Sequence, residues 1–259
     1  MATEYSGGGD AKRGLDLLWG RGERPTRGPK ASMSLDQIVR TAMAIADAEG
    51  LEALSMRKVA AVLGYTPMSL YRYVPSKGEL IDLMLEAVMG DATDLSEVKG
   101  GWREKLRASA VGDWDLYHQH PWMLQISWVR PPLGPRMLAA VNSVLAVTAE
   151  AGFSMRDGAQ VLFTLDHFTR GAARMSIDSL LAEQRTGISD EAWWAERYPF
   201  LREVIESGRY PAFTRAIAEG AYDAPPPGES FTFGLERILD GVALLLPSAK
   251  PKRSGKTPP

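Results

Sequence analysis

Residues 55–74 read Ser-Met-Arg-Lys-Val-Ala-Ala-Val-Leu-Gly-Tyr-Thr-Pro-Met-Ser-Leu-Tyr-Arg-Tyr-Val. Apolar residues recur at helical spacing in the first half of this run, and in the second half Leu70 and Val74 stand four residues apart, where both can face a core. The remaining face of the second half carries Ser, Tyr and Arg. A short helix, a tight turn and a second short helix predict a helix-turn-helix unit that fits a DNA major groove.

The residues at the joints of this unit support the prediction. Ser55 can cap the first helix through its hydroxyl oxygen, and Gly64 falls where the helix end requires left-handed backbone. Thr66 is placed to cap the second helix, with Pro67 at its first position, where the missing N–H is not needed. Pro75 ends that helix, because the residue before a proline avoids helical geometry.

Two further helices flank the unit. Residues 34–37 (Ser-Leu-Asp-Gln) and 76–79 (Ser-Lys-Gly-Glu) both have the pattern of a capping box, in which the first and last side chains bond each other's backbone. Apolar residues at helical spacing follow each box. We therefore predict a DNA-binding domain at residues 34–92. Three helices form its compact head, and a fourth helix, at 76–92, leads out of it.

The head resembles that of the tetracycline-repressor (TetR) family. The matching run is Ala-Glu-Gly-Leu-Glu-Ala-Leu-Ser-Met-Arg-Lys-Val-Ala at 48–60, then Leu-Gly, then Ser-Leu-Tyr-Arg-Tyr-Val at 69–74, then Lys77 and Glu-Leu at 79–80. Looser cues, which include His-Pro-Trp at 120–122, Gly-Pro at 134–135 and Phe-Gly-Leu-Glu-Arg-Ile-Leu-Asp-Gly at 233–241, resemble this family's tetracycline-repressor-like regulatory domain.

The resemblance implies which head residues contact DNA. Arg57, Met68 and Ser69 match positions that reach or approach base edges, and an Arg guanidinium can bond guanine O6 and N7 together. Tyr71 and Lys77 match phosphate-binding positions, and a phenol or an ammonium suits phosphate. The expected DNA-binding set is Arg57, Thr66, Met68, Ser69, Tyr71, Arg72, Tyr73 and Lys77. Tyr73 matches a base or backbone contact, the target of Arg72 is open, and either Tyr71 or Tyr73 can instead pack on the head's own core.

Charge and composition agree with a DNA-binding head. Residues 21–77 hold nine Lys or Arg against five Asp or Glu, whereas residues 78–247 hold fifteen against twenty-four. A DNA-binding protein concentrates positive charge on the contacting face, although ordinary surface variation can also produce this imbalance.

The chain ends are expected to be flexible. Residues 1–33 form an extension in which Ser-Gly-Gly-Gly-Asp at 6–10 is flexible by composition. Arg24 and Arg27 belong to a basic arm rich in Pro and Gly, which can lie in a minor groove or remain a solvated tail. Residues 15–19 (Leu-Asp-Leu-Leu-Trp) can dock on the head or the body, and residues 248–259 form a disordered basic tail.

Residues 93–247 are predicted to form a regulatory and dimerisation body made only of helices, so the fold class is all-α. No stretch alternates as a strand would. We expect helices at 101–119, 121–128, 135–151, 155–184, 190–197, 199–207, 211–220 and 230–246, separated by Pro and Gly.

The resemblance implies that two long helices of the body form a homodimer interface. A two-fold dimer presents two reading helices to a palindromic operator. The expected interface residues are Val161, Leu165, Phe168, Ala172, Phe231, Leu235, Ile238, Leu239, Val242 and Leu246. The same apolar faces can instead be buried within one chain.

Aromatic residues in the body suggest a small-molecule site. An apolar pocket with a few polar groups is the usual form of such a site, and the resembled family has one in this domain. The expected effector-binding residues are Trp114, His118, Trp122, Trp128, Met137, Phe163, His167 and Arg170. Aromatic residues at helical spacing can equally be core, and Asp166 with Arg170 can be a surface ion pair.

Several classes of function are excluded. The chain has no cysteine, no phosphate-binding glycine loop, no nucleophile elbow and no zinc-protease motif, so we expect no enzyme, no metal and no cofactor. No apolar run approaches the roughly 18 residues of a membrane span, and we expect a cytoplasmic protein.

The sequence therefore predicts a dimeric, ligand-responsive DNA-binding regulator, which we expect to be a repressor that its effector releases from DNA. Two alternatives remain. The same scaffold can act as an activator or need a corepressor, or the chain can be a helical ligand-binding or scaffold protein whose head no longer binds DNA.

Overall fold

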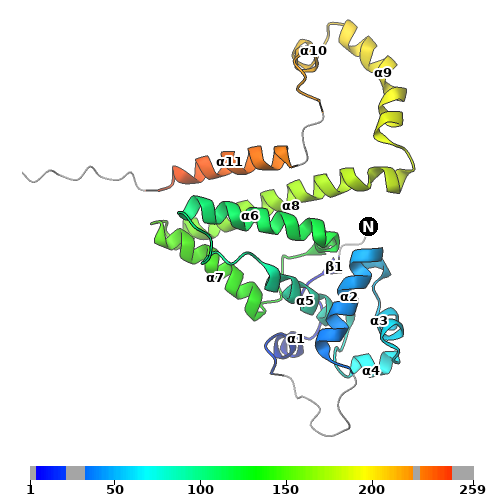
Figure 1. Ribbon diagram of the computed structural model, residues 1–259, viewed down its shortest axis with the longest axis vertical. Helices are drawn as coiled ribbons and strands as arrows, with labels where there is room; N and C mark the ends of the chain where they lie inside the picture. The colour runs from blue at the N-terminus through cyan, green and yellow to red at the C-terminus, as the bar shows by residue number, and fades with distance from the viewer. Residues whose placement is uncertain (1–3, 22–32, 224–227, 247–259) are drawn as a thin grey trace, which may run out of the picture.

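The computed structural model describes residues 4–21, 33–223 and 228–246 (Figure 1). The predicted all-α class is confirmed, because the regular elements in the described part of the chain are helices apart from two strands of two residues each. The head contains α2 (Leu35–Glu49), the 3-10 turn η1 (Leu51–Ala53), α3 (Met56–Leu63), α4 (Pro67–Tyr71), α5 (Lys77–Val88) and η2 (Met89–Asp91).

The body contains α6 (Trp102–Gln119), the 3-10 turn η3 (Pro121–Gln125), β2 (Ile126–Ser127), α7 (Pro135–Glu150), α8 (Met155–Thr186), α9 (Asp190–Glu206), α10 (Pro211–Ala218) and α11 (Glu229–Ala243). Ahead of the head lie β1 (Glu4–Tyr5) and α1 (Ala11–Leu18). Helix α11 lies beside α8, while α2, α3 and α4 gather at the other end of the molecule (Figure 1).

The helix boundaries in the head follow the predicted caps. Ser34 forms a complete capping box with Gln37, the Ser55 hydroxyl accepts the Lys58 amide (3.2 Å), and Gly64 takes left-handed backbone with φ 76°. Thr66 begins α4, but its hydroxyl bonds the Ser69 hydroxyl (3.1 Å) and not a backbone amide. The helix-turn-helix is thus held mainly by the first cap and the glycine.

The second predicted capping box does not form, although Ser76 still caps the helix. Ser76 accepts the Gly78 amide (3.1 Å) and bonds the Glu79 carboxylate directly. The other Glu79 oxygen turns away from the helix start and accepts the amide of Asp10 (2.9 Å), which lies 69 residues earlier in the chain. The box is broken because a segment outside the head supplies a better-placed donor.

One hydrophobic core runs from the head into the body. In the head it contains Ile38, Val59, Leu70 and Val74. Most residues of α5 are buried, so this helix is surrounded by the rest of the protein. The same cluster continues into the body without a break, through Leu116, Tyr117, Trp122, Met123, Ile126, Ala173 and Ile177. A second core lies between α6, α7, α8 and α11, with Leu95 and Phe153 added from connecting segments. The head is therefore packed on the body and is not a free unit.

Two predicted helices differ in the structure. Residues 121–128 form the turn η3 and the strand β2, because β2 pairs with β1 in parallel, with Glu4 opposite Ile126 and Tyr5 opposite Ser127. The predicted break at Pro199 is wrong: α9 runs through it as one helix. A proline inside a helix removes one backbone bond, but the flanking Ala, Glu, Arg and Leu residues favour helix on both sides.

The expectation that residues 1–33 are flexible is wrong for residues 4–21, which fold against α5 and the body. Leu18 of α1 is buried, and the Trp19 indole donates to the Leu133 carbonyl (3.2 Å). Arg24 and Arg27 of the basic arm, and the tail at 248–259, lie outside the described residues.

Helices α9 and α10 stand apart from the rest of the molecule (Figure 1). No described residue of either helix is buried, although α9 carries Trp193, Trp194, Tyr198 and Phe200. Neither helix therefore contributes to the two cores of the single chain.

The contact between head and body includes two buried donors, His120 and Trp122, which share one acceptor on α2. Asp47 Oδ1 accepts both the Trp122 indole N–H (2.6 Å) and the His120 Nδ1–H (2.8 Å). Asp47→Ala leaves both buried donors unpaired, so we expect it to lower the free energy of unfolding by about 2–4 kcal/mol in a denaturant titration.

Asp47→Asn is the matched control for this experiment. Both bonds end on one oxygen, which the amide retains, so the asparagine variant should lose much less stability than the alanine variant. Equal stability of the two variants would show that the bonds contribute little.

Candidate DNA-binding and effector sites

The predicted reading face of the head is exposed. Arg57 on α3, Tyr71 on α4 and the following Arg72 all point to solvent, and Met68 is 72% exposed. Neither arginine forms a hydrogen bond or ion pair with any residue that the structure describes. Two unpaired guanidinium groups next to an exposed phenol can bind base edges and phosphate.

Thr66 is exposed, but three other predicted DNA-binding residues, Ser69, Tyr73 and Lys77, are only partly exposed. Ser69 is half-buried and its hydroxyl bonds Thr66, while Tyr73 is half-buried and packs against the first core. Lys77, the predicted phosphate contact, forms an ion pair with Glu4 (2.8 Å). The alternative of core packing therefore applies to Tyr73 more than to the exposed Tyr71.

A polar cluster lies between α6, α8 and the residues after β2, and Arg170 is its centre. The Arg170 guanidinium lies over the Trp128 ring (4.8 Å) and over the Tyr117 ring (5.3 Å). Its Nη2 lies 3.6 Å from Asp166 Oδ1, and the Tyr117 hydroxyl lies 3.4 Å from the same oxygen. Asp113 adds a second carboxylate, on which Asp166 and Arg170 both act.

Buried donors in and beside this cluster have no partner. Trp128 Nε1, Arg170 Nη2 and Thr169 Oγ1 are buried, and none of them forms a hydrogen bond within the part of the chain that the structure describes. Buried polar groups are normally satisfied, so unpaired donors of this kind are places where an acceptor can bind. The cluster is thus equipped to hold the oxygen atoms of a ligand.

The two acids of the cluster compete for one cation. Burial, together with the charge of Asp166, raises the pKa of Asp113 to about 7, and Arg170 only partly opposes this. Burial also raises the pKa of Tyr117, whose hydroxyl therefore stays protonated. Asp113 can thus exchange a proton near neutral pH, which a charged ligand could exploit.

The structure brings only some of the predicted effector residues to this cluster. Trp128 and Arg170 form it. Trp114 and His118 lie on the neighbouring turn of α6, where Trp114 stacks on Phe231 (4.3 Å) and His118 Nε2 bonds the Ser176 hydroxyl (2.9 Å). Sequence reasoning missed Asp113 and Tyr117, although their spacing of four residues puts them on one helix face.

The remaining predicted effector residues lie elsewhere. Trp122 is buried and bonds Asp47 of the head, and Met137 is buried at the start of α7, against Glu86. Phe163 and His167 stack on each other (6.4 Å) on the exposed face of α8. The prediction that these four residues share one pocket is wrong. Periodicity shows which residues share a helix face, but it does not show which element covers that face.

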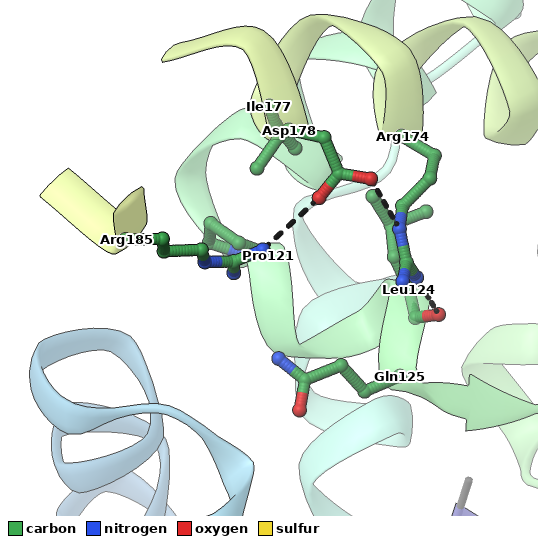
Figure 2. A pocket seen from close by; sticks show the side chains of 7 residues that line it. All are labelled: Pro121, Leu124, Gln125, Arg174, Ile177, Asp178 and Arg185. Atoms are coloured by element: carbon green, nitrogen blue, oxygen red, sulfur yellow. Dashed lines mark hydrogen bonds and ion pairs between the residues drawn. The ribbon is translucent and has the colours of Figure 1, made fainter. Parts of the chain in front are cut away.

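A small cavity lies near the cluster, between η3 and α8 (Figure 2). Its volume of about 20 Å³ holds about one water. Asp178 pairs with both Arg174 (3.0 Å) and Arg185 (3.1 Å), and Arg174 also donates to the Leu124 carbonyl (3.2 Å). The dashed lines in Figure 2 follow these bonds, which close the cavity and tie η3 to α8.

The predicted dimer residues are mostly inside the chain. Six of them are buried in the second core, namely Val161, Leu165, Phe231, Leu235, Leu239 and Val242. Four are half-buried against it, namely Phe168, Ala172, Ile238 and Leu246. The six buried residues have little surface left for another chain, so the assignment of the interface to them is corrected: they form the body's own core.

Neither a metal-binding cluster nor a membrane-spanning helix is present among residues 4–21, 33–223 and 228–246. No group of three or more His, Asp or Glu there could hold a metal ion. Within the same ranges, no helix combines the length and the apolar character needed to cross a membrane.

Comparisons with known proteins agree with this architecture. Residues 38–84 match the model of the bacterial regulatory proteins of the tetR family, and residues 96–246 match the tetracyclin repressor-like C-terminal domain. The HTH-type transcriptional repressor DrrR1 of Streptomyces coeruleorubidus is 45% identical over 246 residues, which cover 95% of this chain and 90% of that protein. The class E tetracycline repressor of Escherichia coli is 30% identical over 85% of this chain and 95% of its own length.

The crystal structure of ActR from Streptomyces coelicolor in complex with (S)-DNPA has the same fold, with a TM-score of 0.66 and 26% identity over 83% of this chain and 98% of that one. A two-domain helical regulator with an N-terminal helix-turn-helix is thus the class that fold and sequence define. The chain belongs to the TetR family of transcriptional regulators.

The titration of Asp113 gives a prediction about stability. Because its folded pKa lies above its ordinary value of 3.8, the native state binds more protons than the unfolded state between about pH 4 and 7. Wild-type stability should therefore fall as the pH rises through this window. Asp113→Asn removes the titration, so at pH 7.5 it should be more stable than wild type by on the order of 2 kcal/mol, and the difference should vanish near pH 4.

Thermal unfolding measured from pH 4 to pH 8 checks this. Asp115→Asn, an exposed position on the same helix, is the control and should keep the wild-type profile. An Asp113→Asn variant whose stability falls with pH as in wild type would contradict the assignment.

Proposed function

We propose that this chain is a transcriptional repressor that binds a palindromic operator as a homodimer and is released by a small-molecule effector. The observation that carries the proposal is the reading face of α3 and α4, where Arg57, Tyr71 and Arg72 point outward while Leu70 and Val74 are buried. The name of DrrR1, a transcriptional repressor, supports repression and not activation.

The effector site that we propose is the Arg170 cluster. ActR, whose fold is similar, has been solved with (S)-DNPA and with actinorhodin. In this chain, the unpaired Trp128 and Arg170 N–H groups can donate hydrogen bonds to ligand oxygens, while the Tyr117 and Trp128 rings offer apolar contact. Binding there would favour a conformation in which the heads no longer match the operator.

A continuous set of contacts can carry this change to the head. Arg170 and Arg174 lie one turn apart on α8, and Arg174 holds η3 through the Leu124 carbonyl. The same turn contains Trp122, which bonds Asp47 of α2.

The dimer interface that we propose lies on the exposed faces of α8 and α11, opposite the second core. On α8, Phe163, Gly171 and Met175 form an exposed stripe at spacings of four or eight residues. On α11, Phe233 and Gly241 are exposed, and a side chain added at Gly171 or Gly241 would meet nothing. Open glycines beside exposed apolar side chains allow two helix pairs to approach closely.

DNA binding is tested by selecting bound sites from random duplex DNA and titrating the selected site at two salt concentrations. Arg57→Ala should weaken specific binding by about 1–3 kcal/mol, because it removes a base contact, and Arg57→Ala with Tyr71→Ala should abolish it.

Arg202→Ala on α9 makes the same change of charge at an exposed position far from the head, and it should bind as wild type does. The proposed reading face would be contradicted if the double variant kept specific binding, or if the wild-type protein bound every duplex with equal affinity.

The interface has its own test. Met175 is 73% exposed in the single chain, so Met175→Lys should leave the fold intact while placing a charge at the proposed interface. We expect the dimer to dissociate at least tenfold more readily in analytical ultracentrifugation, since a buried unpaired charge is strongly unfavourable. Val111→Lys on the exposed face of α6 is the control, and a dimer that survives Met175→Lys unchanged would place the interface elsewhere.

A further inference from the structure

The segment at residues 4–21 bridges two parts of the molecule. Its strand β1 pairs with β2 of the body. The Ser6 hydroxyl donates to the Arg130 carbonyl (2.6 Å) and lies 3.0 Å from the Ser127 carbonyl. The next residue, Gly7, donates its amide to Asp82 Oδ1 on α5 (2.9 Å). Consecutive residues thus hold the body and the exit helix of the head.

Two buried carboxylates on α5 accept hydrogen bonds from this segment. Glu79 and Asp82 are both buried, and they accept the amides of Asp10 and Gly7. A side chain at Gly9 would come within 2.1 Å of the Glu79 carboxylate, so only glycine lets the backbone approach so closely. The Gly-rich run that composition marks as flexible is therefore shaped to fit these carboxylates.

The first residue of the bridge reaches the DNA-binding machinery. Glu4 pairs with Lys77 at the start of α5, directly after the reading helix. Lys77 is the predicted phosphate contact, and its side chain is only partly exposed in this pair. An ammonium paired with a carboxylate in this way cannot fully neutralise a phosphate, so docking of the segment weakens a DNA contact at Lys77.

We propose that residues 4–21 act as an intramolecular clasp, which competes with DNA for Lys77 and holds α5 against the body segment 126–133. The inference rests on the proposed DNA-binding function. The clasp lowers DNA affinity while it is docked, and its release frees one cation for phosphate and one helix for movement. DNA binding and clasp docking thus oppose each other by linkage.

The first test uses Glu4→Gln, which removes the ion pair but keeps the shape of the side chain. At low salt, the variant should bind the selected duplex about three- to tenfold more tightly than wild type, and the salt dependence of binding should steepen by about one counterion. Glu52→Gln makes the same change of charge at an exposed position of the head, where no ion pair forms among the described residues, and it should change binding much less.

The second test undocks the clasp without changing charge. Gly9→Ala forces the Glu79 carboxylate out of its bonds, whereas Gly8→Ala meets only the Tyr5 carbonyl at an ordinary 3.4 Å. Hydrogen exchange of residues 7–10, and trypsin cleavage after Lys12 and Arg13, should increase in Gly9→Ala and not in Gly8→Ala. DNA affinity should rise in the same variant.

The outcomes separate the two proposals. A wild-type protein that binds no DNA sequence specifically would contradict the proposed function. Hydrogen exchange and trypsin cleavage need no DNA, so they measure docking of the clasp whether or not the protein binds DNA. Specific binding by wild type that Glu4→Gln and Gly9→Ala fail to tighten, or that they weaken, would overturn the clasp alone.

Discussion

Three carboxylates on α5 must be hydrogen-bonded because they are buried, and this requirement ties the head to the rest of the chain. Glu79 and Asp82 take amides from the N-terminal segment, and Glu86 takes the amides of Arg136 (2.6 Å) and Met137 (3.3 Å) at the start of α7. The last arrangement also puts a negative charge at a helix N-terminus, which is favourable. Successive turns of α5 thus hold segments that are far apart in the sequence.

The consequence is a head that moves only with its surroundings. The first core passes from α2 through α5 into α6 and α8 without a boundary, so a change in the packing of α8 alters the support of the helix-turn-helix. The polar cluster around Arg170 lies on that same helix, one turn before the arginine that holds η3. A close-packed interior transmits such shifts because it has few voids to absorb them.

Local rules predicted the head well, and they failed where the partner was distant. Ser55 and Gly64 act within a few residues of themselves, so a sequence alone reveals them. Composition predicts a flexible run at 6–10, because Glu79 and Asp82, which order it, stand some 70 residues away. The stripe of α11 was read correctly as apolar, but periodicity does not say whether it is covered by the same chain or by another, and α8 covers it here.

The isolation of α9 and α10 has a consequence for how such a protein can diversify. Because this helical hairpin contributes no side chain to either core, insertions, deletions or new aromatic residues within it leave the folding free energy almost untouched. After gene duplication, the sequence of α9 and α10 can therefore change while the reading head stays intact.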